Sequence, residues 1–383
     1  MLGKILTGER AIGVANIESS SVSFSIVKLQ SATNATIPIT RYAELPLEER
    51  TSGQHLFALK QRLADITKAA INDYTSAHGG RALKKLYAVV HAPWAIGNVV
   101  SASTRFPQET YISEKIMDDC ATKALAQGGK GGELLDVHQL PIMLNGYRTA
   151  HPEGKYAHLV EVAGLMSTCD ANIREEIAKT FRDVLPASRT IIHSGARAIV
   201  EAIEATRPQL RDALCMHVSG EGTEVIVLRN GMVRSYTYIT EGLRSIFSRA
   251  FPGMHPEEAR TAVRLMQRQE GSEVVGVQTE EALLKAEPDM VHAYGEELAK
   301  ISAQLRLPNA VFLIASPDIA PWLQKFFERL DFSQFTVTAQ PFSVDLISAS
   351  EFTSIEDGTS ERNGDLDVAM ATSHVLREEY GSA

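Results

Sequence analysis

The chain has 383 residues, of which 44% are hydrophobic and 22% charged, and its 38 Lys and Arg against 47 Asp and Glu give a formal net charge of −9. This composition indicates a globular protein of several compact units and excludes collagen-like, disordered and disulfide-framework classes. An acidic chain lacks the basic field that nucleic acid or an anionic membrane requires, so we expect neither as a partner.

The cysteines and the apolar stretches indicate a cytoplasmic protein. Cys120, Cys169 and Cys215 lie far apart without a metal-ligand or disulfide spacing, which is typical of buried thiols in a reducing compartment. The longest apolar stretch, residues 86–100, is interrupted by polar residues and proline and is shorter than the roughly 20 residues that span a bilayer. The N-terminus has no apolar run of signal-peptide length.

The N-terminal segment predicts an α/β unit. Residues 11–29 alternate apolar and polar positions around a polar cluster at 18–21, which predicts a β-hairpin with a serine turn. Residues 56–74 carry leucine and isoleucine at helical spacing, and residues 84–91 form a short apolar strand.

Residues 92–188 have the pattern of a separate small subdomain. A strand near 98–106 precedes a helix at 113–126, where Ser113 is expected to cap the helix. Strands near 134–144 and 156–167 flank an Asn145-Gly146 turn, and a helix follows at 171–184.

The α/β pattern returns after residue 188. We expect, in order, an apolar strand at 191–192, a helix at 196–205, strands at 213–218, 224–229 and 233–239, helices within 243–305, a strand at 310–314, a helix at 321–330, a strand at 335–337 and a closing helix at 365–379. Asn230-Gly231 is a strong two-residue hairpin turn between two of these strands.

Three segments carry a family resemblance. NIESSSVSFSIVKL from Asn16 resembles the first phosphate hairpin of the actin-like ATPase superfamily, usually DIGSSSVK, and MHVSGEGTEVIVLRNG from Met216 is similar to the second, IDIGGGTTDIAVFRDG. VFLIASPDIAPWL from Val311 resembles the adenosine loop, VxLTGGGALLPGL. LNGYRTAHPEGK from Leu144 resembles part of the 1C subdomain of FtsA. The resemblance covers nearly the whole chain and is to the branch of FtsA and PilM.

The resemblance implies a two-lobed actin-like, ribonuclease H-like α/β fold with an inserted 1C-type subdomain. The implied division is a first lobe at 10–91, the insert at 92–188, the first lobe continued at 189–212, a second lobe at 213–352 with a mainly helical part at about 248–307, and an acidic loop and terminal helix at 353–383 that return to the first lobe.

The resemblance also places a degenerate nucleotide site on three loops. Its residues are Asn16, Glu18, Ser19, Ser20 and Ser21 in the first hairpin, His217, Ser219, Gly220, Gly222 and Thr223 in the second, and Ala315 and Ser316 in the adenosine loop. Asn16 and His217 stand where the family has the aspartates that organise magnesium, which prefers anionic oxygen ligands. Glu18 replaces a glycine that lets the backbone approach phosphate, and its charge repels that ligand. We therefore expect no ATP, no magnesium and no hydrolysis.

Two other constellations have simpler interpretations. His91, His138, His193 and His217 show no i, i+4 pair on a predicted helix, so we predict no metal site. Ser219, His217 and Glu224 are the residue types of a catalytic triad, but the GxSxG elbow of a hydrolase is missing.

The favoured hypothesis is a catalytically inactive scaffold of the FtsA or PilM type. The resemblance implies that it recruits the cytoplasmic segment of an inner-membrane protein, PilN-like or a division protein, in type IV pilus assembly or cell division. Candidate contact residues are Tyr147, Pro152 and Gly154, which also suit a turn. The terminal helix ends HVLREEYGSA and is too acidic for a lipid anchor, so we expect membrane contact only through a partner. Self-association through the insert stays open.

Two alternatives stay open. One is an active ATP-binding protein that polymerises or hydrolyses ATP with metal ligands from elsewhere. The other is a small-molecule enzyme or kinase on the same fold, for which the sequence offers no distinctive base.

Overall fold

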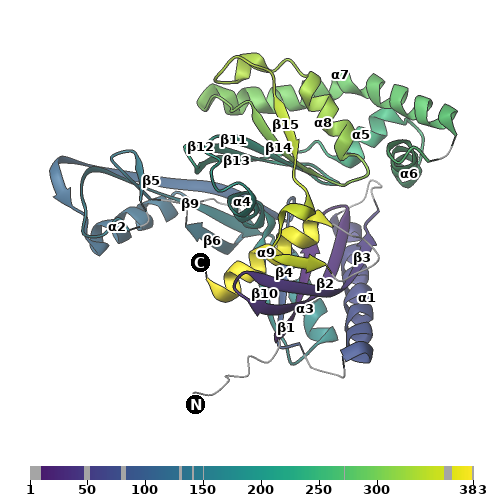
Figure 1. The fold of residues 1–383 in the computed structure, drawn as a ribbon, viewed down its shortest axis with the longest axis horizontal. Helices are drawn as coiled ribbons and strands as arrows, with labels where there is room; N and C mark the ends of the chain where they lie inside the picture. Colours follow the sequence, from purple (N-terminus) through teal and green to yellow (C-terminus); the bar gives the residue numbers. More distant parts are fainter. Residues whose placement is uncertain are drawn as a thin grey trace.

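The computed structural model describes residues 10–46, 52–78, 83–128, 132–139, 142–149, 151–270, 272–357 and 365–381, which form three sheets with helices packed on them (Figure 1). The acidic stretch expected before the terminal helix lies, for residues 358–364, outside the described residues. In this described part of the chain, each helix is too short or too polar to cross a membrane.

The first lobe is built on a mixed sheet. Among the described residues its strand order is β10 (Arg189–Ser194), β4 (Lys85–Val90), β1 (Arg10–Ile17), β2 (Ser21–Ser31), β3 (Asn34–Glu44) and β16 (Ile355–Asp357). Both faces of this sheet are buried. Alternate residues of β1 pack into two different hydrophobic cores, one on each face. Ala15 and Ile17 pack with α1 (Ser52–His78) and α3 (Ala171–Val184), whereas Ile12 and Val14 pack with α4 (Gly195–Thr206) and α9 (Leu366–Tyr380).

The insert projects from the first lobe as a second sheet (Figure 1). Its long strands β5 (Ala95–Tyr111) and β9 (Tyr156–Cys169) pair antiparallel, and β9 also pairs with β6 (Glu133–Gln139) and β7 (Ile142–Leu144). β8 (Tyr147–Thr149) pairs with β7 across the predicted Asn145-Gly146 turn, where both residues have positive φ. α2 (Glu114–Leu125) covers one face and begins at Ser113, whose side chain caps the helix as expected.

The second lobe repeats the α/β plan. Its sheet has the order β13 (Met232–Ile239), β12 (Thr223–Arg229), β11 (Ala213–Val218), β14 (Ala310–Ala315) and β15 (Ser343–Leu346), as far as the described residues extend. α5 (Leu243–Ala250), α6 (Pro256–Gln267), α7 (Glu273–Gln304) and α8 (Ala320–Arg329) lie over it in Figure 1, and η1 (Ser333–Phe335) and η2 (Ala349–Glu351) are short 3-10 turns. The Asn230-Gly231 turn joins β12 to β13 as predicted.

Three expectations from the sequence need correction. The strand expected at 335–337 makes only one isolated bridge, between Thr336 and Leu307, and the fifth strand of this sheet is β15 instead. β3 was not expected, although it is the central partner of β2 and β16. α3 lies in the range assigned to the insert, but its buried residues Ile173, Ile177 and Phe181 belong to the core of the first lobe.

Candidate functional site

The two predicted phosphate hairpins face each other between the lobes and are hydrogen-bonded together. The backbone N–H of Glu221 donates to Ser19 Oγ at 2.9 Å, and Ser19 Oγ donates to Ser219 Oγ at 3.3 Å. Ser219 Oγ in turn donates to the carbonyl of Gly222 at 3.0 Å. The polar groups of the two predicted phosphate hairpins are therefore satisfied by one another.

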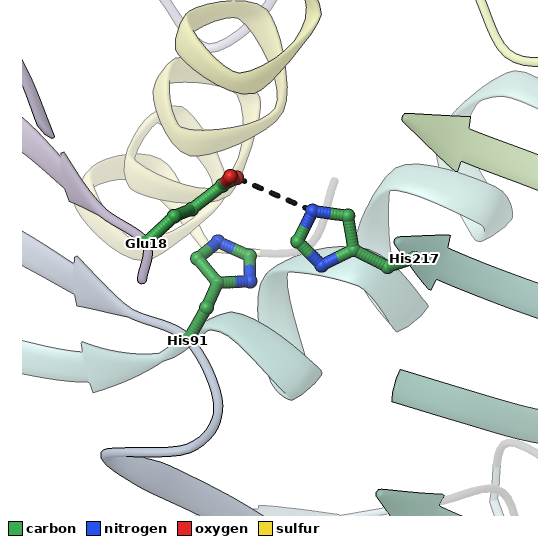
Figure 2. A group of neighbouring side chains, drawn as sticks. All are labelled: Glu18, His91 and His217. Atoms are coloured by element: carbon green, nitrogen blue, oxygen red, sulfur yellow. Dashed lines mark ion pairs between the residues drawn. The ribbon is translucent and has the colours of Figure 1, made fainter. Parts of the chain in front are cut away.

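A buried cluster of ionisable side chains lies next to this contact. Glu18 follows β1, His91 follows β4, and His217 is on β11, so the cluster joins both lobes (Figure 2). His217 Nε2 lies 3.2 Å from Glu18 Oε1, and its Nδ1 lies 3.0 Å from Glu224 Oε2. His91 Nδ1 lies 3.2 Å from the same Glu224 oxygen. Each of these side chains is nearly inaccessible to solvent.

Asn16 and Tyr236 complete the cluster. Asn16 Oδ1 lies 3.0 Å from His91 Nε2, and its Nδ2 donates to Glu18 Oε1 at 3.3 Å. Tyr236 donates its hydroxyl proton to Glu224 Oε1 at 2.7 Å. The polar atoms of this buried group thus find partners within it, as buried polar groups generally must.

The ionisation of the cluster is set by close opposite charges. Burial alone would lower the pKa of His217, but Glu18 and Glu224 raise it well above its usual value. Burial opposes ionisation of both glutamates, yet the histidines hold the pKa of Glu18 and of Glu224 below the usual range. Burial and the nearby charge of Glu18 raise the pKa of Asp367, on α9, well above its usual value. The cluster is therefore a tightly coupled ionic contact between lobes.

A small cavity of about 320 Å³ lies beside the cluster, between the loops that the sequence predicts for nucleotide binding. Glu18, His217 and the adenosine-loop residues Ala315 and Ser316 line it. Across this cavity, Glu44 on β3 accepts from Arg260 at 2.9 Å and Arg264 at 3.0 Å, both on α6. Ion pairs thus join the two lobes at this cavity as well.

The remaining predicted loop residues serve the local fold. Thr223 Oγ1 donates to the carbonyl of Glu241 at 2.6 Å, and Gly222 is needed because a Cβ there would lie 2.4 Å from the carbonyl oxygen of Ile239. The carbonyls of Gly220 and Ser21 accept turn hydrogen bonds from Arg244 and Glu18, and that of Ser20 accepts from Leu45.

Sequence reasoning separated residues that the structure brings together. The nucleotide loops predicted from the sequence do not include His91, Glu224, Tyr236 or Asp367, although the sequence also offers His91 among its histidines and Glu224 beside Ser219 and His217. Ser219 donates to Gly222 while His217 pairs with two carboxylates, so the triad residues do not form a nucleophile–base pair. The sequence signal that could have found His91 is its position directly after a short apolar strand.

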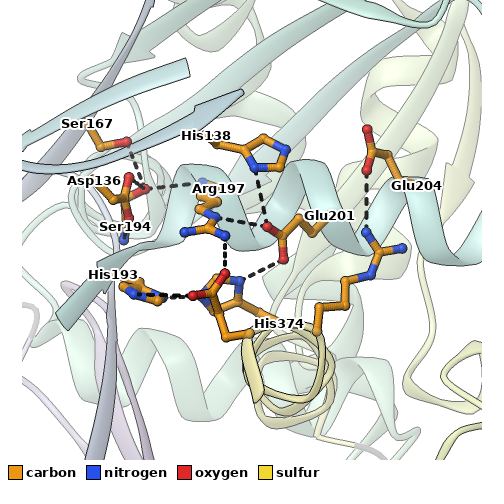
Figure 3. A network of polar contacts seen from close by, with 11 residues as sticks. Asp136, His138, Ser167, His193, Ser194, Arg197, Glu201, Glu204 and His374 are labelled. Atoms are coloured by element: carbon orange, nitrogen blue, oxygen red, sulfur yellow. Dashed lines mark hydrogen bonds and ion pairs between the residues drawn. The ribbon is translucent and has the colours of Figure 1, made fainter. Parts of the chain in front are cut away.

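His138 and His193 belong to a different buried network (Figure 3). His193 Nδ1 lies 2.7 Å from His374 Nε2, and His374 Nδ1 lies 2.8 Å from Glu201 Oε2. His138 Nδ1 lies 3.5 Å from Glu201 Oε1. This network joins β6 of the insert to β10, α4 and α9, and so fixes the insert and the terminal helix to the first lobe.

The candidate partner residues lie on β8 and within residues 151–155, which together with Tyr111 and Tyr156 are called the tip of the insert below. Tyr147 is 78% exposed, whereas Pro152 is buried and Gly154, with φ of 79°, forms a turn whose N–H donates to Ile112. Two further exposed tyrosines, Tyr111 and Tyr156, pair across β5 and β9 with ring centroids 5.6 Å apart. The tip therefore displays aromatic side chains to solvent.

A groove with a volume of about 580 Å³ runs along the insert toward the second lobe. Its lining includes Ala102 on β5, Ala126 at the end of α2, Val162 on β9 and Met232 on β13. Lys123, Glu161 and Arg234 supply its charged groups.

Comparison with known proteins identifies the fold. No family model matches the sequence, and no curated protein matches it. The structure matches the PilM-PilN type IV pilus biogenesis complex with a TM-score of 0.57 and 14% identity, over 96% of this chain and 98% of that chain. It also aligns with the ethanolamine utilization protein EutJ from Carboxydothermus hydrogenoformans at a TM-score of 0.43, with 10% identity over 87% of this chain and 84% of that one. The predicted two-lobed actin-like fold of the PilM type is confirmed.

Proposed function

On this actin-like fold, we propose that the chain is a catalytically inactive scaffold that binds the cytoplasmic segment of an inner-membrane protein during type IV pilus assembly. The observation that carries the proposal is the match to the PilM-PilN complex over nearly the whole of both chains, including the insert. A protein of this kind works at the cytoplasmic face of the inner membrane through its partner.

The chemistry of the cleft supports a role without nucleotide. A magnesium-bound triphosphate needs backbone N–H donors and carboxylates around the metal. Here the Glu221 N–H donates to Ser19, and the positions of the family's aspartates are Asn16 and His217, whose polar atoms contact His91, Glu18 and Glu224. Seating the ligand would break these contacts and bring phosphate beside the Glu18 carboxylate. The residues present do not fit this ligand.

The insert supplies the surface that a partner segment requires. The groove combines small and flexible apolar side chains with two cations, Lys123 and Arg234, and one carboxylate, Glu161. This net positive lining suits an extended segment with apolar residues and a carboxylate. Tyr147 lies on β8. This strand pairs with β7, which in turn pairs with the groove strand β9. Exposed aromatic residues are frequent anchors in interfaces. We therefore place the partner on the groove and the neighbouring tip.

The test is binding of labelled peptides from the N-terminal cytoplasmic segments of pilus inner-membrane proteins of the same organism, measured by fluorescence anisotropy. We expect one PilN-like segment to bind, and Arg234→Glu to weaken binding at least about tenfold by reversing a groove charge. Lys325→Glu, on the exposed side of α8 in the second lobe, is the matched control and should leave binding unchanged. The proposal is contradicted if no such segment binds, or if Arg234→Glu binds the segment as tightly as Lys325→Glu does.

A further inference from the structure

Three side chains from both lobes converge as a set of metal-ligand atoms. Glu18, His91 and His217 each offer one ligand atom, and these atoms all lie within 4.8 Å of one another. The first two come from the first lobe and His217 from the second, and all three are buried. Figure 2 shows one nitrogen of each imidazole ring on the side of the Glu18 carboxylate.

Glu224 orients both imidazoles for this arrangement. Its Oε2 lies 3.0 Å from His217 Nδ1 and 3.2 Å from His91 Nδ1. An ionised carboxylate only accepts hydrogen bonds, so each Nδ1 carries a proton and each Nε2 faces away from Glu224. Metal-binding histidines typically donate their other N–H to a carboxylate in this way. Tyr236 donates to the second oxygen of Glu224 and holds the carboxylate in place.

The atoms opposite Glu224 can bind a cation once the two Nε2 atoms give up the protons that bond Glu18 and Asn16. His217 Nε2 and Glu18 Oε1 lie 3.2 Å apart, and His91 Nε2 lies 3.0 Å from Asn16 Oδ1. Two ligands of a tetrahedral zinc ion with bonds of about 2.0–2.1 Å lie about 3.3 Å apart, close to the first of these separations. One divalent cation beside two neutral imidazoles would also balance the charges of Glu18 and Glu224, which burial makes costly to leave uncompensated.

We propose that Glu18, His91 and His217 bind one zinc ion, and that this ion joins the two lobes. Imidazole and carboxylate ligands suit zinc, whereas magnesium requires mainly oxygen ligands. Glu18 and His217 also line the 320 Å³ cavity, which gives the ion a route to the ligands. The ion fixes the relation of the lobes at the base of the cleft. This inference does not depend on the partner proposed above.

The first test measures zinc binding to the full chain after treatment with EDTA. Calorimetry with zinc chloride should give one ion per chain with a Kd of about 1 μM or tighter, and saturating zinc should raise the Tm, whereas magnesium chloride should not. Glu18→Gln and His217→Gln should abolish the stoichiometric site. Glu224→Gln should weaken zinc binding about 10–100-fold, as expected for a group that orients ligands.

The matched control is His292→Gln, because His292 lies on α7 with its side chain 76% exposed. It should bind zinc like the unsubstituted chain. A chain that binds no zinc, or that binds it equally well with Glu18→Gln and His217→Gln, overturns the proposal and leaves a purely ionic contact in its place.

A second measurement needs no variant and covers the case in which a substitution prevents folding. Crystals of the unsubstituted chain grown with zinc should show an anomalous peak within bonding distance of the Glu18 carboxylate and both Nε2 atoms. A peak elsewhere, or none at this cluster, counts against the site.

Discussion

Ser19 and Ser219 hydrogen-bond through their Oγ atoms at 3.3 Å across the two lobes, although 200 residues separate them in the chain. Each belongs to a hairpin whose sequence resembles a phosphate hairpin of the actin-like superfamily. Here the hairpins contact each other, and the same Ser19 oxygen accepts from the backbone N–H of Glu221. The lobes are thus joined through the residues of the two predicted phosphate hairpins.

Removing the Ser19 hydroxyl should destabilise the fold. Ser19→Ala leaves the Glu221 N–H without its acceptor, and an unsatisfied donor of this kind costs about 1–3 kcal/mol. We expect the urea midpoint to fall accordingly, with an unchanged m-value. Ser31→Ala, at the exposed end of β2, is the control and should lower the free energy of unfolding by less than about 0.5 kcal/mol. Equal effects of the two substitutions would show that the hairpin contact adds no stability.

The ion pairs across the cavity should restrain lobe opening. Burial opposes ionisation of Glu44, but Arg260 and Arg264 lower its pKa, so the carboxylate is charged at neutral pH. Glu44→Gln removes that charge from between two arginines. We expect the free energy of unfolding to fall by about 1–2 kcal/mol. Hydrogen exchange followed by mass spectrometry should show faster exchange in α6 and in the 315–319 segment.

The control for this experiment is Glu280→Gln on the exposed surface of α7. It should leave exchange in α6 unchanged. Protection of α6 that is the same in Glu44→Gln as in the unsubstituted chain would contradict a restraining role for these ion pairs.

The histidine network around Glu201 predicts loss of stability in acid. Burial and the neighbouring His374 and Arg197 lower the pKa of His193 from 6.5 to about 4. Burial opposes ionisation of Glu201, but His374 and Arg197 lower its pKa from 4.5 to about 2. In both cases the unfolded chain binds the proton more readily. Stability is therefore complete above about pH 6.5 and falls as the pH drops toward 4 and then toward 2.

His193→Gln should remove the first part of this loss. Between pH 6.5 and 4 the unsubstituted chain should lose about 2–3 kcal/mol more than the variant, measured by urea unfolding at a series of pH values. His151→Gln, at an exposed position in the insert, should follow the unsubstituted chain. Parallel curves for His193→Gln and the unsubstituted chain would show that His193 does not carry the linkage.

Most helices, strands and hairpin turns could be predicted because the sequence signal of each lies within the element itself. Asn230-Gly231 and Asn145-Gly146 mark hairpins through positive φ, and the alternation in residues 11–29 marks β1 and β2. β3 was missed because Pro38 interrupts it. The structure tolerates this proline because β16 pairs only with Ala35 to Ile37, so Pro38 lies where that side of β3 has no pairing in the described residues.

The sequence alone could not show which residues make up the site, because the site joins segments that are far apart in the chain. The motifs located Glu18 and His217, since both lie in hairpins that resemble family motifs. His91 joins them only because β4 is parallel to β1 and ends at the same sheet edge. Glu224 faces His217 because the two residues are register partners in β11 and β12. These relationships follow from strand order and register, which the spacing of histidines along the sequence does not reveal.

Calorimetric titration of the full chain with Mg-ATP tests the central claim most directly, because that claim is that protein groups have taken the place of the nucleotide between the lobes. We predict no saturable heat, which corresponds to a Kd weaker than about 1 mM. Saturable binding with a Kd at or below about 1 mM would contradict the account.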